Sequence, residues 1–232
     1  MVSMRGLLIL LAFVTTTAGS HELWFEKEAN TYILYQGHRH SSHRGAAWVP
    51  YAPGSVKGFV CIDDDGVAQR FGPAQAYPAK ISGDCATLYT TFSTGFWTQT
   101  AWETKNQAKT GLSGVIKSWY SAESLKRIER WTTHSLKPIG LGLEITPMSN
   151  PFLLKAGDKL IVLITEGAQP VAGIPVAYAG EVRGFSGADG KVAIRLRQGG
   201  LQLLAASFES PLTDGQADVA IHTASIQFEI EK

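Results

Sequence analysis

Beyond its first twenty residues, the chain alternates short apolar runs with clusters of turn-forming residues. Runs rich in β-branched and aromatic side chains occupy residues 31–40, 57–62, 86–92 and 94–103. DDDG at residues 63–66 and SGD at residues 82–84 separate some of these runs. Short runs of this composition, bounded by Gly, Asp and Ser, predict β-strands joined by tight turns.

One segment departs from this strand pattern. In SAESLKRIERW, which spans Ser121 to Trp131, the apolar residues Leu125, Ile128 and Trp131 recur at a spacing of three. That spacing places side chains on one face of a helix, so a short helix is expected here. An edge strand is the alternative interpretation.

The pattern changes again around PMSNP at residues 147–151. From there the apolar runs are short and regular, at residues 159–167, 174–182, 191–198, 201–209 and 219–230, with turns rich in Gly and Pro between them. Regular short strands of this kind predict a small antiparallel sandwich. We therefore expect an all-β protein with at most one short helix. We divide it into two β-sandwich-like domains, residues 21–149 and 150–232.

The first twenty residues predict a cleaved signal peptide. Arg5 precedes an apolar run from Gly6 to Val14, which is shorter than the roughly 20 residues that span a bilayer. Ala18 and Ser20 are small enough to be recognised by the signal protease, so cleavage is expected before His21. Cleavage after Ala18 is the alternative. An exported protein is expected with either cut.

The remaining charges exclude some partners. Removing Arg5 from the 21 basic residues leaves 20, which balance the 20 acidic residues. A balanced surface has no bulk attraction for nucleic acid or anionic lipid. The rest of the sequence offers no apolar stretch long enough to span a membrane, so we expect no stable membrane insertion of the mature chain.

Cys61 and Cys85 are the two cysteines of the chain. A single pair in an exported protein predicts a disulfide bond. It would close a loop of about 25 residues, for which loop entropy gives about 3 kcal/mol of stabilisation. Metal ligation by the thiolates is a weaker alternative, because neither cysteine belongs to a CxxC motif.

The densest polar motif is GHRHSSHRG, which contains His38, His40 and His43. In an extended strand, side chains two residues apart share a face, so His38 and His40 would point the same way. Neutral imidazole is the commonest protein ligand of zinc, copper and nickel, and the motif therefore predicts a metal site. A solvated basic loop is the alternative, since Arg39 and Arg44 flank the histidines.

His21 strengthens the metal interpretation. As the first residue of the mature chain it would offer a metal both its ring nitrogen and its α-amine, whose pKa lies near 7.7–8.0. Cleavage after Ala18 would instead make Gly19 the amine donor, and His21 would be the third residue of the mature chain. The chelate would then combine an amine, two amide nitrogens and an imidazole.

Enzyme motifs are not found in the sequence. It contains no GxSxG, HExxH, Walker or dinucleotide-binding motif, so we expect a protein without catalytic activity. The remaining histidine of interest, His222, shares a strand face with Ala224 and Ile226, and we expect it to be a core residue with its polar atoms paired.

Several motifs together resemble a known family. HELWFE after the signal, YQGHRH, GFWTQT, SWYSAESLKRIERW and KPIGLGLEITPMSNP are similar to periplasmic accessory components of nickel and cobalt uptake systems. AQPVAGIPVAY and GFSGADGKVAIRL, after Asn150, resemble transthyretin-like or carboxypeptidase-regulatory-like modules. The resemblance implies that the C-terminal domain is an immunoglobulin- or transthyretin-like sandwich.

The resemblance also implies a function. A member would bind Ni²⁺ or Co²⁺ and pass it to a nickel or cobalt membrane transporter. His21, His38 and His40 fall on the family's histidine motifs, and His43 completes the set of candidate ligands. An all-nitrogen site would bind Cu²⁺ more tightly still. A copper oxidase or monooxygenase with a histidine brace, and a structural or adhesive envelope protein, are the alternatives.

Overall fold

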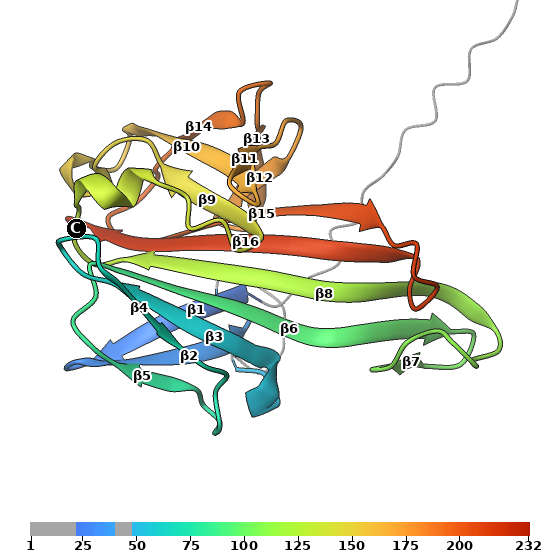
Figure 1. Ribbon diagram of the computed structural model, residues 1–232. Helices are drawn as coiled ribbons and strands as arrows, with labels where there is room; N and C mark the ends of the chain where they lie inside the picture. Colours follow the sequence, from blue (N-terminus) through green and yellow to red (C-terminus); the bar gives the residue numbers. More distant parts are fainter. Residues whose placement is uncertain (1–21, 40–47) are drawn as a thin grey trace, which may run out of the picture.

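The computed structural model describes residues 22–39 and 48–232, and it is built almost wholly of β-strands (Figure 1). Sixteen strands form three sheets, and three single-turn 3₁₀ helices lie at η1 Pro53–Ser55, η2 Thr133–Leu136 and η3 Pro151–Leu153. The described residues contain no α-helix. The predicted all-β, sandwich-like class is confirmed.

The largest sheet has nine strands. In spatial order they are β13 Glu181–Phe185, β12 Pro175–Tyr178, β15 Gly200–Pro211, β16 Val219–Ile230, β8 Val115–Ile128, β6 Thr87–Thr100, β3 Val56–Ile62 and β4 Ala68–Phe71, with β7 Thr104–Lys105 paired to β6. The long strands β6, β8 and β16 run through the middle of the molecule (Figure 1).

Two smaller sheets cover the two faces of this large sheet. The first contains β1 Glu22–Glu28, β2 Thr31–Gly37 and β5 Lys80–Ser82. The second contains β9 Leu143–Pro147, β10 Lys159–Glu166, β11 Gln169–Pro170 and β14 Lys191–Arg195. The two lie on opposite sides of the long strands (Figure 1).

Each covering sheet encloses its own hydrophobic core. Leu125 on β8 packs with residues of β1 and β2 in one buried cluster. Ile128, three residues further along the same strand, packs with residues of β9, β10 and β14 in the other. Successive side chains of a strand point to opposite faces, so β8 contributes to both cores.

The helix predicted from Ser121 to Trp131 is wrong. Ser121 to Ile128 belong to β8, a central strand hydrogen-bonded to β6 on one side and β16 on the other. Because both faces of β8 are buried, apolar residues occur on both, and Leu125 and Ile128 face different cores. The spacing of three is therefore not the signature of a single apolar face.

The two halves of the sequence meet in one sheet. β16, from the C-terminal half, pairs in parallel with β8, from Val219 opposite Trp119 to Gln227 opposite Arg127. Leu203, also C-terminal, packs in the core beneath β1 and β2. The large sheet thus crosses the boundary predicted near Asn150, and a division into separately folding domains stays a prediction.

The predicted disulfide bond is confirmed. Cys61, near the end of β3, is bonded to Cys85, which precedes β6, across a sequence separation of 24. The predicted DDDG turn joins β3 to β4, and Asp63 Oδ1 accepts a hydrogen bond from Val67 N at 2.8 Å. The disulfide therefore closes the β3–β4 hairpin onto the start of the next central strand.

A buried ion pair joins the large sheet to its second cover. Lys126 on β8 contacts Glu144 on β9, and both side chains are almost fully inaccessible to solvent. Lys126 Nζ also donates to Thr146 Oγ1 at 2.9 Å, while Glu144 Oε2 accepts from the backbone N–H groups of Ile139 and Gly140 at 2.8 and 2.9 Å. These bonds compensate for the loss of hydration.

Replacing Lys126 by Met should destabilise the protein by about 3–5 kcal/mol, because it leaves the buried carboxylate of Glu144 without its cation. The double variant Lys126→Met/Glu144→Gln should recover part of the loss, since Gln can still accept from the two backbone N–H groups. Urea unfolding of the three proteins measures both effects. A loss below about 1 kcal/mol in the single variant would contradict the predicted dependence on the pair.

Candidate metal centre

The β1–β2 hairpin is adjacent in sequence to two of the predicted ligands. In each strand of the hairpin, alternate apolar residues face the core. The two strands are joined by a two-residue turn in which Ala29 has a φ of 52°. The strands pair in register over seven residue pairs, and Glu22 lies opposite Gly37 at the open end. His21 directly precedes Glu22 in the sequence, and His38 directly follows Gly37. The two ends of the hairpin, Glu22 and Gly37, therefore lie side by side, and each is adjacent in sequence to one candidate ligand.

Trp48 and Val49 lie beside the end of β2. Gly37 forms a bridge with Trp48, and Val49 N donates to Gln36 O at 2.7 Å. Gly37 and Trp48, which flank the histidine-rich segment in the sequence, therefore lie side by side at the open end of the hairpin.

One of the four predicted ligands lies in the described part of the chain. His38 is half-buried beside the end of β2. His21, His40 and His43 lie outside the described residues. Within residues 22–39 and 48–232, no group of three or more His, Cys, Asp and Glu side chains could hold a metal ion. The four-histidine site therefore stays a prediction.

Aromatic rings and one ion pair fix the start of the histidine motif. The Trp24 and Tyr35 ring centroids are 5.9 Å apart, as are those of Tyr35 and Trp48. The Arg39 guanidinium lies 5.6 Å from the Trp24 ring centroid and 3.3 Å from Glu26 Oε1. A cation is attracted to the face of an aromatic ring, so these contacts hold the Arg39 side chain against Trp24 and Glu26 of β1.

A carboxyl group that the sequence did not single out lies on the large sheet. Glu123 of β8 pairs with Phe92 of β6, and its Oε1 accepts from Ser121 Oγ at 2.9 Å. Burial raises the pKa of Glu123 to about 7, against the lowering effect of the Ser121 hydrogen bond. In the predicted helix, Glu123 would have lain on the solvated face opposite Leu125 and Ile128. In a strand, the spacing of two from Ser121 and Leu125 places Glu123 on the same face as both, and this spacing could have been recognised in the sequence.

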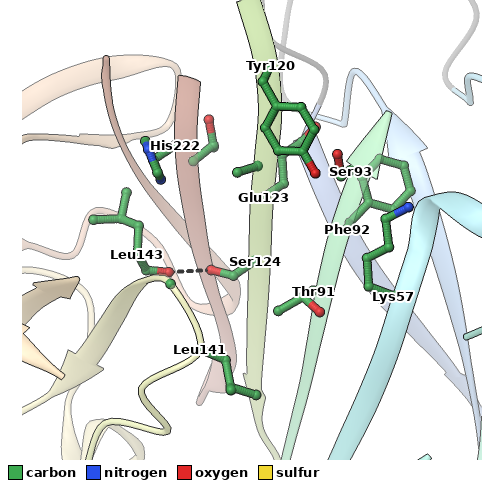
Figure 2. A pocket seen from close by; sticks show the side chains of 13 residues that line it. Lys57, Thr91, Phe92, Ser93, Tyr120, Glu123, Ser124, Leu141, Leu143 and His222 are labelled. Atoms are coloured by element: carbon green, nitrogen blue, oxygen red, sulfur yellow. Dashed lines mark hydrogen bonds between the residues drawn. The ribbon is translucent and has the colours of Figure 1, made fainter. Parts of the chain in front are cut away.

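Glu123 also contributes to a cavity of about 160 Å³ beside β8 (Figure 2). The lining comes from β3, β6, β8, β16 and residues 141–143, and it includes Lys57, Tyr120 and His222. Ser124 Oγ donates to Leu143 O at 2.6 Å and fixes one wall of the cavity. The cavity lies where the second covering sheet ends on the long strands.

His222 lies at the rim of this cavity and has a hydrogen-bond partner. Its ring stacks on Phe208 at a centroid distance of 4.7 Å, and its Nε2 lies 3.0 Å from Ser210 Oγ. Its Nδ1 is 3.7 Å from Glu166 Oε1. The order serine, histidine, carboxylate is that of a hydrolase triad, but 3.7 Å exceeds a hydrogen bond. Ser210 also lies in a strand paired with β16. We therefore interpret the three side chains Ser210, His222 and Glu166 as a packing contact between β10 and the large sheet.

The raised pKa of Glu123 predicts a pH dependence of stability. The ordinary value is 4.5 and the folded value about 7, so the folded protein retains a proton that the unfolded chain loses between these pH values. The free energy of unfolding should therefore fall as pH rises through this window and should level off above it.

Glu123→Gln removes this titration. In metal-free buffer, the stability of the variant relative to the natural protein should increase from pH 4.5 to pH 7, as measured by urea unfolding at several pH values. Parallel stability curves for the two proteins would contradict a raised pKa at this position.

Comparison with known proteins places the chain in a family. A search of curated proteins finds no match. Among solved structures, the central fibronectin-III array of RIM-binding protein is 12% identical, with 91% of this chain and 68% of that chain covered and a TM-score of 0.25, which does not establish a common fold. Residues 18–210, most of the chain, match the family described as "Domain of unknown function (DUF4198)", and the protein belongs to that family.

Proposed function

We propose that this protein is a periplasmic carrier that binds Ni²⁺ or Co²⁺ and delivers it to a membrane transporter. The single observation that carries the proposal is the register of the β1–β2 hairpin. Glu22 opposite Gly37 brings together the chain positions next to His21 and His38. The bridge from Gly37 to Trp48 brings the residue that follows the histidine motif beside the end of β2.

The donor chemistry suits these metals. Signal cleavage before His21 would provide an α-amine and an imidazole on one residue, which form a chelate without further strain. His38, and His40 beyond it, would add imidazoles. Nitrogen donors of this kind suit Ni²⁺, Co²⁺ and Cu²⁺, and intrinsic affinity favours copper. Delivery of nickel or cobalt therefore depends on which metal is available outside the cytoplasm.

A carrier needs a site that both binds and releases. The candidate site lies at the open end of a two-stranded hairpin, on the outer part of the first covering sheet, with exposed Trp48 beside it. A transporter could reach metal held there without opening either hydrophobic core. In the described part of the chain, no helix is long and apolar enough to cross a membrane.

The test is calorimetric titration of the mature protein, beginning at His21, with Ni²⁺, Co²⁺, Cu²⁺ and Zn²⁺. We expect Ni²⁺ and Co²⁺ to bind with a Kd of about 1 μM or below. His38→Ala and His40→Ala should each weaken binding by about tenfold or more. His134→Ala, which alters a histidine in η2, far from the hairpin in sequence, is the matched control and should leave affinity unchanged.

Two results would overturn the proposal. One is the absence of Ni²⁺ and Co²⁺ binding tighter than about micromolar. The other is binding that is unaffected by both hairpin substitutions. Mass spectrometry of the protein from native cells, read for the N-terminal residue and for bound metal, provides an independent check on the cleavage site.

A further inference from the structure

The long central strands carry a pair of tryptophans on the part of the large sheet that extends past both covering sheets. β6, β8 and β16 run beyond the two smaller sheets towards β7 (Figure 1). On this extension, Trp97 of β6 lies directly opposite Trp119 of β8, and the next residue of β6, Thr98, pairs with β7. The two ring centroids are 6.4 Å apart, the ring planes differ by 11°, and both residues are partly exposed. We call the face of the sheet that bears these nearly parallel rings the tryptophan face.

The opposite face of this extension is covered by turns of the same chain. Thr98 and Ser118, which are sequence neighbours of the tryptophans, form a cross-strand pair that is fully buried. Thr98 Oγ1 donates to Gln107 O at 2.9 Å, and Ser118 Oγ donates to Asp218 Oδ2 at 2.7 Å. Successive side chains of a strand point to opposite faces. The turns that contain Gln107 and Asp218 therefore cover the face that points away from the tryptophans.

Polar side chains that are open to solvent border the rings on the tryptophan face. Lys117 is two residues before Trp119 on β8, so the two side chains share this face. Gln99, which is exposed, lies opposite Lys117 and is two residues after Trp97. Lys117 Nζ contacts Glu209 Oε1 at 3.0 Å, and these two side chains are 46% and 50% exposed. An ammonium, a carboxylate and an amide thus offer accessible hydrogen-bond donors and acceptors beside the rings.

A β-bulge orients Trp97 and leaves space beside it. The register of β6 with β8 shifts between Phe92 and Gly95. Within the bulge, Thr94 Oγ1 accepts from Trp97 Nε1 at 2.8 Å, which fixes the indole. Gly95 has a φ of 80°, and in the described part of the chain no atom outside its adjacent residues lies within 4 Å of where a Cβ would be. Because Gly95 is two residues from Trp97, this open space adjoins the rings on the same face.

The charges at this end of the sheet favour a neutral ligand. Lysines here contact carboxylates in the pairs Lys105–Glu103, Lys109–Asp218 and Lys117–Glu209. Paired charges give no net attraction for a polyanion or a polycation. Partly exposed tryptophans, in contrast, are enriched where proteins bind other molecules, because a large rigid ring gains contact area at little cost in side-chain entropy. The tryptophan face therefore suits an uncharged ligand that has both an apolar side and many hydrogen-bonding groups.

We propose that the tryptophan face binds a neutral polysaccharide, whose sugar rings stack on Trp97 and Trp119. A pyranose ring presents C–H groups on its flat side and hydroxyl groups around its rim. The negative face of an aromatic ring attracts polarised C–H groups, as it attracts cations. The hydroxyls donate to Glu209 and accept from Lys117 and Gln99. The open space at Gly95 lets the polymer continue past the rings. The site uses no residue of the histidine motif, so this binding needs no metal.

The test is electrophoresis through native gels that contain hydroxyethyl cellulose, glycogen or galactomannan, with alginate as an anionic polymer. We expect at least one neutral polymer to retard the natural protein, equally with and without EDTA, and alginate to have no effect. Trp97→Ala and Trp119→Ala should each weaken binding by about tenfold or more, because each removes a stacking surface. Phe185→Ala, which removes another exposed aromatic ring on the edge strand β13, is the matched control and should bind as the natural protein does.

Three results would overturn the proposal. The first is free migration of the natural protein in all three neutral polymers, and the second is retardation that both tryptophan variants retain. The third is a natural protein that self-associates in sedimentation while both variants are monomers, because the face would then bind a second copy of the chain. Circular dichroism checks the fold of each variant. If a tryptophan variant does not fold, Gln99→Ala/Lys117→Ala, which alters exposed side chains only, decides: weaker binding supports the site and natural affinity overturns it.

Discussion

The parallel ladder between β8 and β16 is the interaction on which the rest of this structure depends. It runs from Val219 opposite Trp119 to Gln227 opposite Arg127, and it joins residues about a hundred positions apart. Because the last strand of the chain is inserted beside β8, the strands from both halves become one sheet. The same ladder brings Gln227 and Arg127 to one level, from which both bind Phe25 and position the first hairpin.

Covering that sheet on both faces has a cost that the polar residues of β8 reveal. Each buried charge on a two-sided strand needs its own compensation, because neither face offers water. Lys126 finds it in Glu144 and Arg127 in Glu129. Among the described residues no ion pair is formed by Glu123, whose carboxyl accepts a hydrogen bond from Ser121 Oγ instead.

Membership of the DUF4198 family does not by itself assign a function to the residues of this chain. The hairpin concentrates the relevant positions. Glu22 opposite Gly37 and Gly37 opposite Trp48 define three neighbouring points on the backbone. From these points the histidine-bearing segments continue. The proposed site would therefore lie next to a paired, registered scaffold, and paired strands hold ligand positions more precisely than an unsupported loop does.

The sequence by itself determined the all-β class, the disulfide between Cys61 and Cys85, and the tight turn at DDDG, because each depends on local composition or on a single pair of cysteines. It also identified the histidine motif, since HxH spacing is a local signal. The tertiary structure decided what local patterns cannot encode. It made Ser121–Ile128 a central strand, because burial on both faces erases the alternation that identifies a strand. It also aligned β1 with β8 and β16, because that alignment depends on hydrogen bonds between residues 102 and 202 positions apart.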